Sequence, residues 1–222
     1  MYIVQRVGQR FGYVQFVRIG VQPKLNVHGL PHFLQAGLAA FFRTVADASS
    51  VPIILYDIPY RTGVVLELAT LRALAAHERI VAIKDCGGDA AKTQALIADG
   101  QLQVLAGEDA QIFSTLALGG AGAIAASAHA HTGHFVELMQ CLERGDLPAA
   151  RALWQPLQPH IAACFAEPNP APIKALLAQQ GRMRATLRAP MQPASAALAQ
   201  RLAGIQLPLL PSADSVAERR SA

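Results

Sequence analysis

Short apolar segments alternate with amphipathic segments from residue 36 to residue 145. Four of them are almost wholly apolar, which predicts β-strands buried on both faces: 51–56, 80–84, 102–106 and 121–126. The segments beside them carry apolar residues on one face at helical spacing, which predicts helices: 36–48, 66–76, 90–98, 110–118 and 133–144. Strands and helices that alternate at roughly 20 to 30 residues per unit are typical of βαβ units in a parallel sheet.

The two ends of the chain depart from this alternation. Three later segments predict helices with no strand between them: 146–166, 170–180 and 192–202. We therefore expect a helical region over 146–206, followed by a short flexible tail over 207–222. Near the start, 13–21 is compatible with a strand, but glycines and a proline interrupt the rest of 1–35, and this segment receives no assignment.

The composition is that of a globular protein. Of the 222 residues, 52% are hydrophobic and 15% are charged, which excludes a disordered chain and allows a substantial core. No apolar stretch approaches the roughly 20 residues of a membrane span, and the opening residues lack the pattern of a signal peptide. Cys86, Cys141 and Cys164 are odd in number and widely spaced, so we expect reduced thiols in a cytoplasmic protein without a membrane partner.

The net charge of +4 belongs to the first segment of the chain. Five basic residues precede the first acidic residue, Asp47: Arg6, Arg10, Arg18, Lys24 and Arg43. The remainder carries 14 basic and 15 acidic residues. A nucleic-acid surface is more often a basic patch interleaved with aromatic residues on the folded body. We therefore expect no nucleic-acid partner.

Lys84 carries the clearest chemical signal. It ends the apolar run 80–84, and a lysine at the end of a buried strand is costly unless it is paired or used. Desolvation lowers the pKa of such a lysine and leaves a free amine, which can attack a carbonyl and form a Schiff base. The alternative is a lysine whose side chain reaches solvent from the strand end.

Other residues of chemical interest lie at or beside the ends of predicted strands. Tyr56 closes the first strand and could relay protons for an amine on the next one, or be a buried tyrosine bonded to backbone. Arg61 follows it and could hold a carboxylate, or be a surface arginine in a turn. The glycine run 119–122 precedes a strand, so it fits close approach to a small ligand, or tight packing, better than a dinucleotide loop. In parallel α/β folds, residues at the carboxyl ends of strands converge.

A metal site is the less favoured interpretation of the histidine cluster. His129, His131 and His134 follow the last predicted strand, and no later set of histidine and aspartate completes a ligand shell. The neighbouring acids Glu108 and Asp109 fit an anionic pair at a helix N-terminus better than an acid–base couple. We therefore expect neither a metal nor a cofactor.

Five segments of the chain form a recognisable set: 55–63 (LYDIPYRTG), 82–85 (AIKD), 105–109 (LAGED), 119–124 (GGAGAI) and 165–174 (FAEPNPAPIK). Their order and spacing resemble those of dihydrodipicolinate synthase, in the family of pyruvate-dependent class I aldolases and lyases. The resemblance runs from about residue 36 to residue 205. The tyrosine loop, the lysine strand and the Glu-Pro-Asn-Pro segment are jointly specific, whereas any one of them alone is weak.

The resemblance implies a lyase that works through a Schiff base. Lys84 would form the imine with pyruvate, Tyr56 would shuttle protons, and Ile124 would contact pyruvate through its backbone. The reaction would be the condensation of pyruvate with aspartate semialdehyde, on the diaminopimelate route to lysine. The family also implies a homo-oligomer, a dimer or a tetramer.

The loop after the first strand would bind the second substrate. Arg61 would hold the carboxylate of aspartate semialdehyde, with Thr62 and Gly63 completing the loop. The Arg-Thr-Gly and Glu-Pro-Asn-Pro segments favour the synthase over the related sialic acid lyases and ketodeoxygluconate aldolases.

The chain also departs from the family pattern. The barrel of this family has eight strands, and the pattern here predicts four. The Gly-Thr-Thr-Gly-Glu and Thr-Pro-Tyr-Tyr segments of the family's first half are absent, and Gly87 replaces a usual serine or threonine. One hypothesis unites the departures: residues 1–33 come from an out-of-frame or misassigned start on a truncated gene, which the upstream DNA would reveal in another frame.

We therefore expect an α/β fold, a partial TIM barrel of about four βα units over 36–145, with a helical C-terminal extension. The expected function is a dihydrodipicolinate synthase-like lyase. A catalytically dead remnant or assembly partner is one alternative, because a half barrel exposes two sheet edges. A pyruvate-dependent aldolase that acts on a sugar acid is another.

Overall fold

The computed structural model describes residues 2–5, 15–17 and 31–210, with side chains from residue 34 onward. The chain divides into two compact units, one of which is Ile3–Ala125 and the other Ala126–Ala222 together with the first two residues. The first unit holds the parallel sheet, and the second is helical. The expected domain boundary between residues 145 and 146 stays a prediction, because compactness alone does not define a folding domain.

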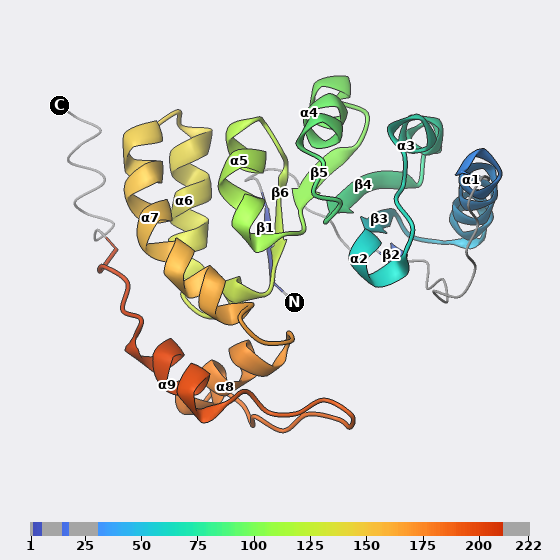
Figure 1. Cartoon of the computed structure of the whole chain (residues 1–222). Coiled ribbons are helices and arrows are strands. Elements are labelled where there is room, and N and C mark those ends of the chain that lie inside the picture. The colour runs from blue at the N-terminus through green and yellow to red at the C-terminus, as the bar shows by residue number, and fades with distance from the viewer. Residues whose placement is uncertain (1, 6–14, 18–30, 211–222) are drawn as a thin grey trace. The chain divides into compact units, whose positions relative to one another are not determined.

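A six-stranded sheet forms the centre of the first unit (Figure 1), in the order β1-β6-β5-β4-β3-β2. Its strands are β1 (Tyr2–Gln5), β2 (Gln15–Val17), β3 (Ile53–Asp57), β4 (Ile80–Asp85), β5 (Gln103–Ala106) and β6 (Gly122–Ala125). Neighbouring strands from β2 through β6 pair in parallel. All four predicted strands are thereby confirmed. Of the strand considered over 13–21, residues 15–17 form β2, and the other positions lie outside the described residues.

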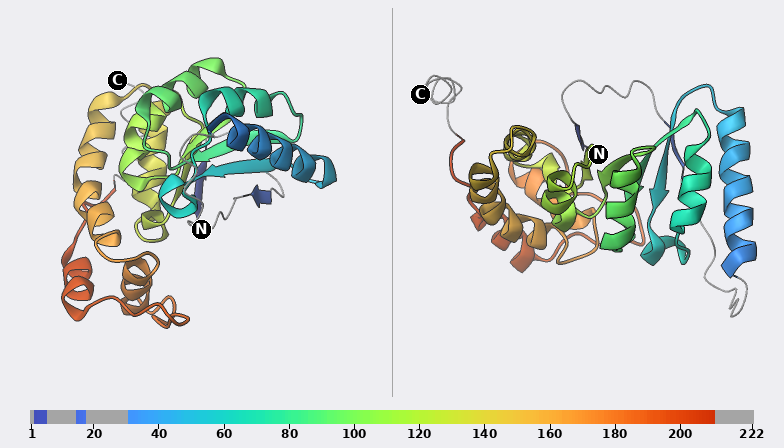
Figure 2. Two further views of the ribbon diagram at one scale, coloured as in Figure 1. Left: turned by 45° about the vertical axis from the view of Figure 1, so that its right-hand side comes forward. Right: turned by 90° about the horizontal axis from the view of Figure 1, so that it is seen from above.

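Helices follow the strands as the alternation predicts. The first unit contains α1 (Pro31–Ala48), α2 (Pro59–Thr62), α3 (Leu68–Ala75), α4 (Ala90–Asp99), the 3₁₀ helix η1 (Asp109–Gln111) and α5 (Ile112–Ala117). The helices α1, α3, α4 and α5 lie in a row along the sheet (Figure 2). The sequence pattern missed α2, a turn of four residues, because Pro59 at its start and the left-handed Gly63 after its end are also typical of a loop.

Alternate strand residues enter two separate parts of the core. Ile53, Leu55 and Ile83 pack with helical residues such as Leu71 and Leu74. The residues between them face the other side of the sheet and form a smaller cluster: Ile54, Ala82, Leu105, Ala121 and Ile124. Because strand side chains alternate between faces, Tyr56 and Lys84 continue the row of Ile54 and Ala82. Burial on both faces, expected from the apolar runs, is confirmed.

The second unit is built from helices that pack on one another. They are η2 (Ser127–His129), α6 (Thr132–Glu143), α7 (Leu147–Cys164), α8 (Ala171–Gln179) and α9 (Ala196–Gly204). Asp146 and Ser195 cap α7 and α9 by accepting backbone N–H bonds. The predicted tail begins at residue 207. Within its described part, Pro208 accepts a hydrogen bond from His134 at 2.7 Å, and residues 211–222 lie outside the described chain.

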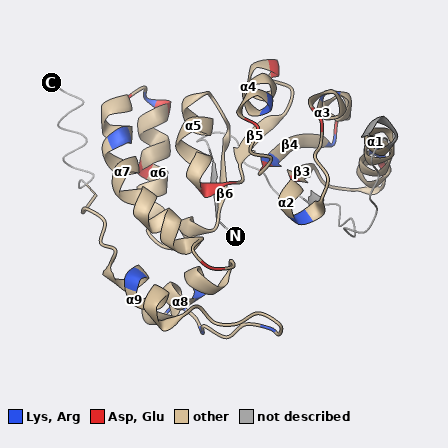
Figure 3. Cartoon of the chain, in the orientation of Figure 1, with Lys and Arg blue, Asp and Glu red and all other residues tan. Residues whose placement is uncertain are grey.

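Charged residues are spread over many elements of the described chain, with positive and negative positions interspersed (Figure 3). None of the helices in that part of the chain combines the length and hydropathy that a membrane span requires.

Candidate active site

Tyr56 and Lys84 lie side by side at the carboxyl ends of neighbouring strands. They are register partners in the parallel pair β3–β4. The Nζ atom of Lys84 lies 4.4 Å from the centroid of the Tyr56 ring, above its face. Two residues that lie 28 positions apart in sequence thus form one chemical unit, at the sheet edge where parallel α/β folds place their sites.

Burial makes Lys84 a candidate nucleophile. The residue is only 8% exposed, so it does not reach solvent as the alternative interpretation required. Desolvation lowers its pKa below the ordinary value, while the charges of Cys86, Asp109 and Glu108 oppose the shift. A lowered pKa raises the fraction of free amine near neutral pH, and the free amine is the form that attacks a carbonyl.

Tyr56 is suited to donate a proton. Burial raises the pKa of its hydroxyl, and Cys86, Tyr60 and Glu108 raise it further. The phenol therefore stays protonated beside the amine. A protonated hydroxyl on the ring that faces the amine can supply the proton for the loss of water from a carbinolamine.

Three residues beside this pair were not assigned a role from sequence. Burial raises the pKa of the Cys86 thiol to about 12, although Lys84 lowers it. Burial and then Glu108 raise the pKa of Tyr60 to about 12. A period of two along the strand places Cys86 on the face of Lys84, and that signal could have identified it. Gly107 has no room for a side chain, because a Cβ there would lie 2.3 Å from Cys86 Sγ.

The two acids after β5 differ in their environments. Glu108 precedes η1 but makes no capping hydrogen bond through its side chain, and Asp109 lies in the first turn and is buried. Both charges raise the pKa of Lys84. The sequence placed the pair correctly at a helix start, and the structure adds its electrostatic effect on the lysine.

The three residues of the Arg-Thr-Gly loop lie in different environments. Arg61 is exposed, and its guanidinium carbon lies 5.7 Å from the centroid of the Tyr60 ring. The Thr62 hydroxyl is buried among the backbone groups of Ile58 and Val64, and Gly63 ends α2 with φ +74°. Thr62 and Gly63 thus shape the loop, and Arg61 is its accessible charge.

Ile124 lies within β6 and is almost fully buried. It belongs to the same cluster as Ile54 and Ala82, so it shares the sheet face that carries Tyr56 and Lys84 farther along their strands. Its contact with a substrate stays a prediction.

The histidine cluster belongs to the second unit. The centroid of the His131 ring lies 4.9 Å from that of the His160 ring and 5.9 Å from that of the His134 ring, and both pairs pack edge to face. Burial, His160 and His134 lower the pKa of His131 to about 4. Among the described residues, no group of three or more His, Cys, Asp or Glu side chains is arranged to hold a metal ion.

Comparison with known proteins identifies the family. Residues 19–205 match the model of the dihydrodipicolinate synthetase family. The chain belongs to this family. A dihydrodipicolinate synthetase relative, 4-hydroxy-tetrahydrodipicolinate synthase 2 of Clostridium acetobutylicum, is 39% identical over 189 residues, which cover 81% of this chain and 66% of the relative. The 4-hydroxy-tetrahydrodipicolinate synthase of Enterococcus faecalis is 42% identical over 158 residues, covering 71% of this chain and 54% of the relative.

Solved structures of the family share the fold. The dihydrodipicolinate synthase of Thermotoga maritima has a TM-score of 0.73 and is 29% identical, covering 77% of this chain and 60% of that protein. The enzyme DapA-2 of Bacillus anthracis, with a TM-score of 0.79, is similar in fold. The α/β class and the partial TIM barrel are therefore confirmed. The chain spans between about half and two thirds of the length of these relatives.

Proposed function

We propose that this chain is a Schiff-base lyase that condenses pyruvate with aspartate semialdehyde, as a step of lysine biosynthesis through diaminopimelate. The observation that carries the proposal is the buried amine of Lys84 above the ring of Tyr56. Membership of the dihydrodipicolinate synthetase family supports the choice of reaction.

The first step is the formation of an imine. The neutral amine of Lys84 attacks the ketone carbon of pyruvate, and a carbinolamine results. Tyr56 donates a proton to the carbinolamine hydroxyl, which leaves as water, and a protonated imine remains on Lys84. The lowered pKa of Lys84 favours the free amine and the raised pKa of Tyr56 favours the protonated hydroxyl, which are the forms that this step uses.

The second step joins the two substrates. Loss of a proton from the pyruvate methyl carbon gives an enamine, and this carbon attacks the aldehyde of the second substrate. Arg61 is placed in α2 as an exposed cation that can bind the carboxylate of aspartate semialdehyde. Ile124 would line the pyruvate side through its backbone. Neither step requires a cofactor.

Reductive trapping tests the proposal. Pyruvate and borohydride are added to the full chain, and the adduct is mapped by peptide mass spectrometry. We expect one adduct, on Lys84, and none in Lys84→Met. A wild-type chain without an adduct on Lys84 contradicts the proposal.

A second candidate function is that of a non-catalytic assembly partner. It is favoured by the coverage of the relatives, which is 66% for the protein of Clostridium acetobutylicum and 54% for that of Enterococcus faecalis. A folded chain that gives no adduct supports this candidate. If the adduct does form, turnover of aspartate semialdehyde against sugar-acid aldehydes separates the synthase from a sugar-acid aldolase.

We also propose that the chain self-associates and acts in the cytoplasm. One solved relative is described as the first monomeric dihydrodipicolinate synthase variant, which supports association as the usual state of such enzymes. Light scattering across a concentration series measures the state of this chain. A mass that stays at that of one chain contradicts the proposed association.

A further inference from the structure

Two carboxylates directly follow the candidate catalytic residues. Asp57 comes after Tyr56, and Asp85 comes after Lys84. The two acids are register partners across β3 and β4, and both are buried. Because side chains alternate along a strand, they point to the face opposite Tyr56 and Lys84. Two neighbouring buried carboxylates are unfavourable unless other groups compensate them.

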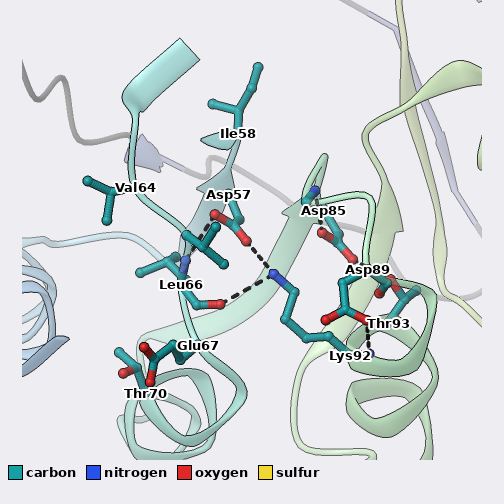
Figure 4. A network of polar contacts seen from close by, with 12 residues as sticks. Asp57, Ile58, Val64, Leu66, Glu67, Thr70, Asp85, Asp89, Lys92 and Thr93 are labelled. Atoms are coloured by element: carbon teal, nitrogen blue, oxygen red, sulfur yellow. Dashed lines mark hydrogen bonds and ion pairs between the residues drawn. The ribbon is translucent and has the colours of Figure 1, made fainter. Parts of the chain in front are cut away.

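Lys92, in the first turn of α4, compensates Asp57. Its Nζ atom donates to Asp57 Oδ2 at 2.6 Å and to the carbonyl of Leu66 at 3.3 Å (Figure 4). The backbone N–H of Leu66 in turn donates to Asp57 Oδ1 at 3.2 Å. Lys92 is only 5% exposed. Burial raises the pKa of Asp57, and the ion pair with Lys92 opposes that rise.

The next residue of α4, Thr93, binds the other carboxylate. Its hydroxyl donates to Asp85 Oδ2 at 2.5 Å, and the backbone N–H of Gly87 donates to Asp85 Oδ1 at 2.8 Å. Asp89 caps the helix by accepting from the backbone N–H of Lys92 at 3.0 Å (Figure 4). Consecutive residues of one capped helix turn therefore hold the ends of two neighbouring strands.

Gly87 is fitted to this arrangement. A Cβ at this position would lie 2.7 Å from Lys92 Nζ and 3.0 Å from Asp85 Oδ1. The absence of a side chain leaves the space that the lysine occupies. The loop between β4 and α4 is thus shaped around the buried ammonium group.

We propose that Lys92 and Thr93 are positioning residues for the pair of Tyr56 and Lys84. The inference rests on the proposed function, because it concerns the rate of imine formation. The distance between Lys84 Nζ and the Tyr56 ring depends on how the ends of β3 and β4 are placed relative to each other. The α4 turn fixes both ends through Asp57 and Asp85. A displacement of roughly 1 Å in such a pair can cost on the order of 100-fold in rate.

Lys92 is not itself a nucleophile in this arrangement. Its ammonium is bound by Asp57 and Leu66 on the helix side of the sheet. We therefore expect pyruvate to label Lys84 and not Lys92. Peptide mapping of the pyruvate adduct distinguishes the two buried lysines.

The test measures the rate of pyruvate trapping on Lys84 in the full chain, as a function of pyruvate concentration. Thr93→Val, which removes the hydroxyl, is expected to lower the maximal rate by about tenfold or more while half-saturation changes little. Thr93→Ser keeps the hydroxyl and is expected to restore the rate. Thr44→Val is the matched control, because the Thr44 hydroxyl is exposed and donates to the carbonyl of Ala40 in its own helix.

The ion pair is tested with the double variant Asp57→Asn and Lys92→Met. It removes both members of the ion pair together, so neither Asp57 nor Lys92 is left as an unpaired buried charge, and it is the variant of this pair that is expected to stay folded. We expect it to fold, as measured by circular dichroism and thermal unfolding, and to trap pyruvate about tenfold or more slowly than the wild type. Folded Thr93→Val and double variants that trap pyruvate at the wild-type rate overturn the inference. A wild type that is not trapped at all overturns the proposed function, and the inference with it.

Discussion

Burial decides the chemistry of individual residues at this site. Lys84 and Tyr56 are ordinary side chains whose pKa values move in opposite directions, because desolvation disfavours the charged form of each. Burial disfavours the ammonium form of Lys84 and the phenolate form of Tyr56. The same physical cause therefore favours the free amine of Lys84 and keeps the hydroxyl of Tyr56 protonated.

The pH dependence of trapping is expected to report the pKa of Lys84. The rate rises as the amine loses its proton, and the midpoint is expected below the ordinary lysine value of about 10.4. Because the charge of Glu108 raises the pKa of Lys84, Glu108→Gln is expected to move the midpoint to lower pH. The measurement is the trapping rate across a pH series. Glu78→Gln, at an exposed position, is the control, and a Glu108→Gln midpoint that is unchanged or higher contradicts the prediction.

Removal of the Tyr56 hydroxyl is expected to slow imine formation. Tyr56→Phe keeps the ring beneath Lys84 and removes the proton donor, so the maximal trapping rate is expected to fall by about 100-fold or more. Half-saturation by pyruvate is expected to stay close to the wild-type value. Single-turnover trapping measures both quantities. An unchanged maximal rate would assign Tyr56 a packing role only.

The candidate active site lies at the ends of strands and helices, and particular residues determine the conformation of those ends. The strands and most helices follow from the periodicity of apolar residues, as the predicted segments 80–84 and 90–98 show against β4 and α4. The turn α2 could not be predicted in this way, since four residues are too few to show a helical period. Its conformation follows instead from Pro59, Thr62 and the left-handed Gly63.

Two glycine substitutions are expected to have opposite effects on stability. Gly107→Ala places a Cβ 2.3 Å from Cys86 Sγ and 2.8 Å from the carbonyl of Asp85, so it is expected to destabilise the fold by about 1–3 kcal/mol. Gly37→Ala, in α1 with open space around it, is expected to stabilise by about 0.5–1 kcal/mol. Urea unfolding with matched m-values measures both. Equal effects of the two changes would contradict the close packing at Gly107.

The cap of α4 is expected to contribute measurable stability. Asp89→Ala removes the acceptor for the Lys92 backbone N–H and is expected to cost about 1 kcal/mol, whereas Asp89→Asn retains an acceptor and is expected to cost much less. The measurement is the free energy of unfolding in urea. A loss as large in Asp89→Asn as in Asp89→Ala would show that the charge matters more than the cap.

At the scale of the whole chain, the two compact units have different chemical characters. The unit before Ala126 holds the sheet with the candidate active site, and the helical unit after it holds the histidine cluster. His131 adopts a left-handed conformation with φ 56° and packs edge to face with His134 and His160. The second unit is therefore expected to respond to acid through a group that does not belong to the candidate active site.

Acid is expected to destabilise the second unit through His131. Its pKa is about 4 in the folded chain, below the ordinary value of about 6.5, so the unfolded chain binds the proton first. The stabilising contribution is present above pH 6.5 and is lost as the pH falls toward 4. His131→Asn, whose side chain tolerates a positive φ, is expected to reduce this loss. Unfolding is followed by fluorescence of Trp154, the one tryptophan of the chain, which lies in α7. A variant with the wild-type pH dependence contradicts the prediction, and His77→Asn in the first unit is the control.

The order of strands and helices follows from the sequence, because buried strands and amphipathic helices each impose a local period on apolar residues. The sequence also placed Tyr56 and Lys84 at the ends of strands and Arg61 after a strand, and its five segments identified the family. It could not supply the partners of Asp57, since Lys92 lies 35 positions away and no local pattern joins them.

Which groups meet, and how strongly they are desolvated, depends on how the strands and helices pack. In the structure, Lys84 Nζ lies 4.4 Å from the centroid of the Tyr56 ring. The buried carboxylates of Asp57 and Asp85 accept hydrogen bonds from two consecutive residues of α4. A pKa and an ion pair depend on neighbours that are distant in sequence and on the exclusion of water, and both arise only when the strands and helices have packed.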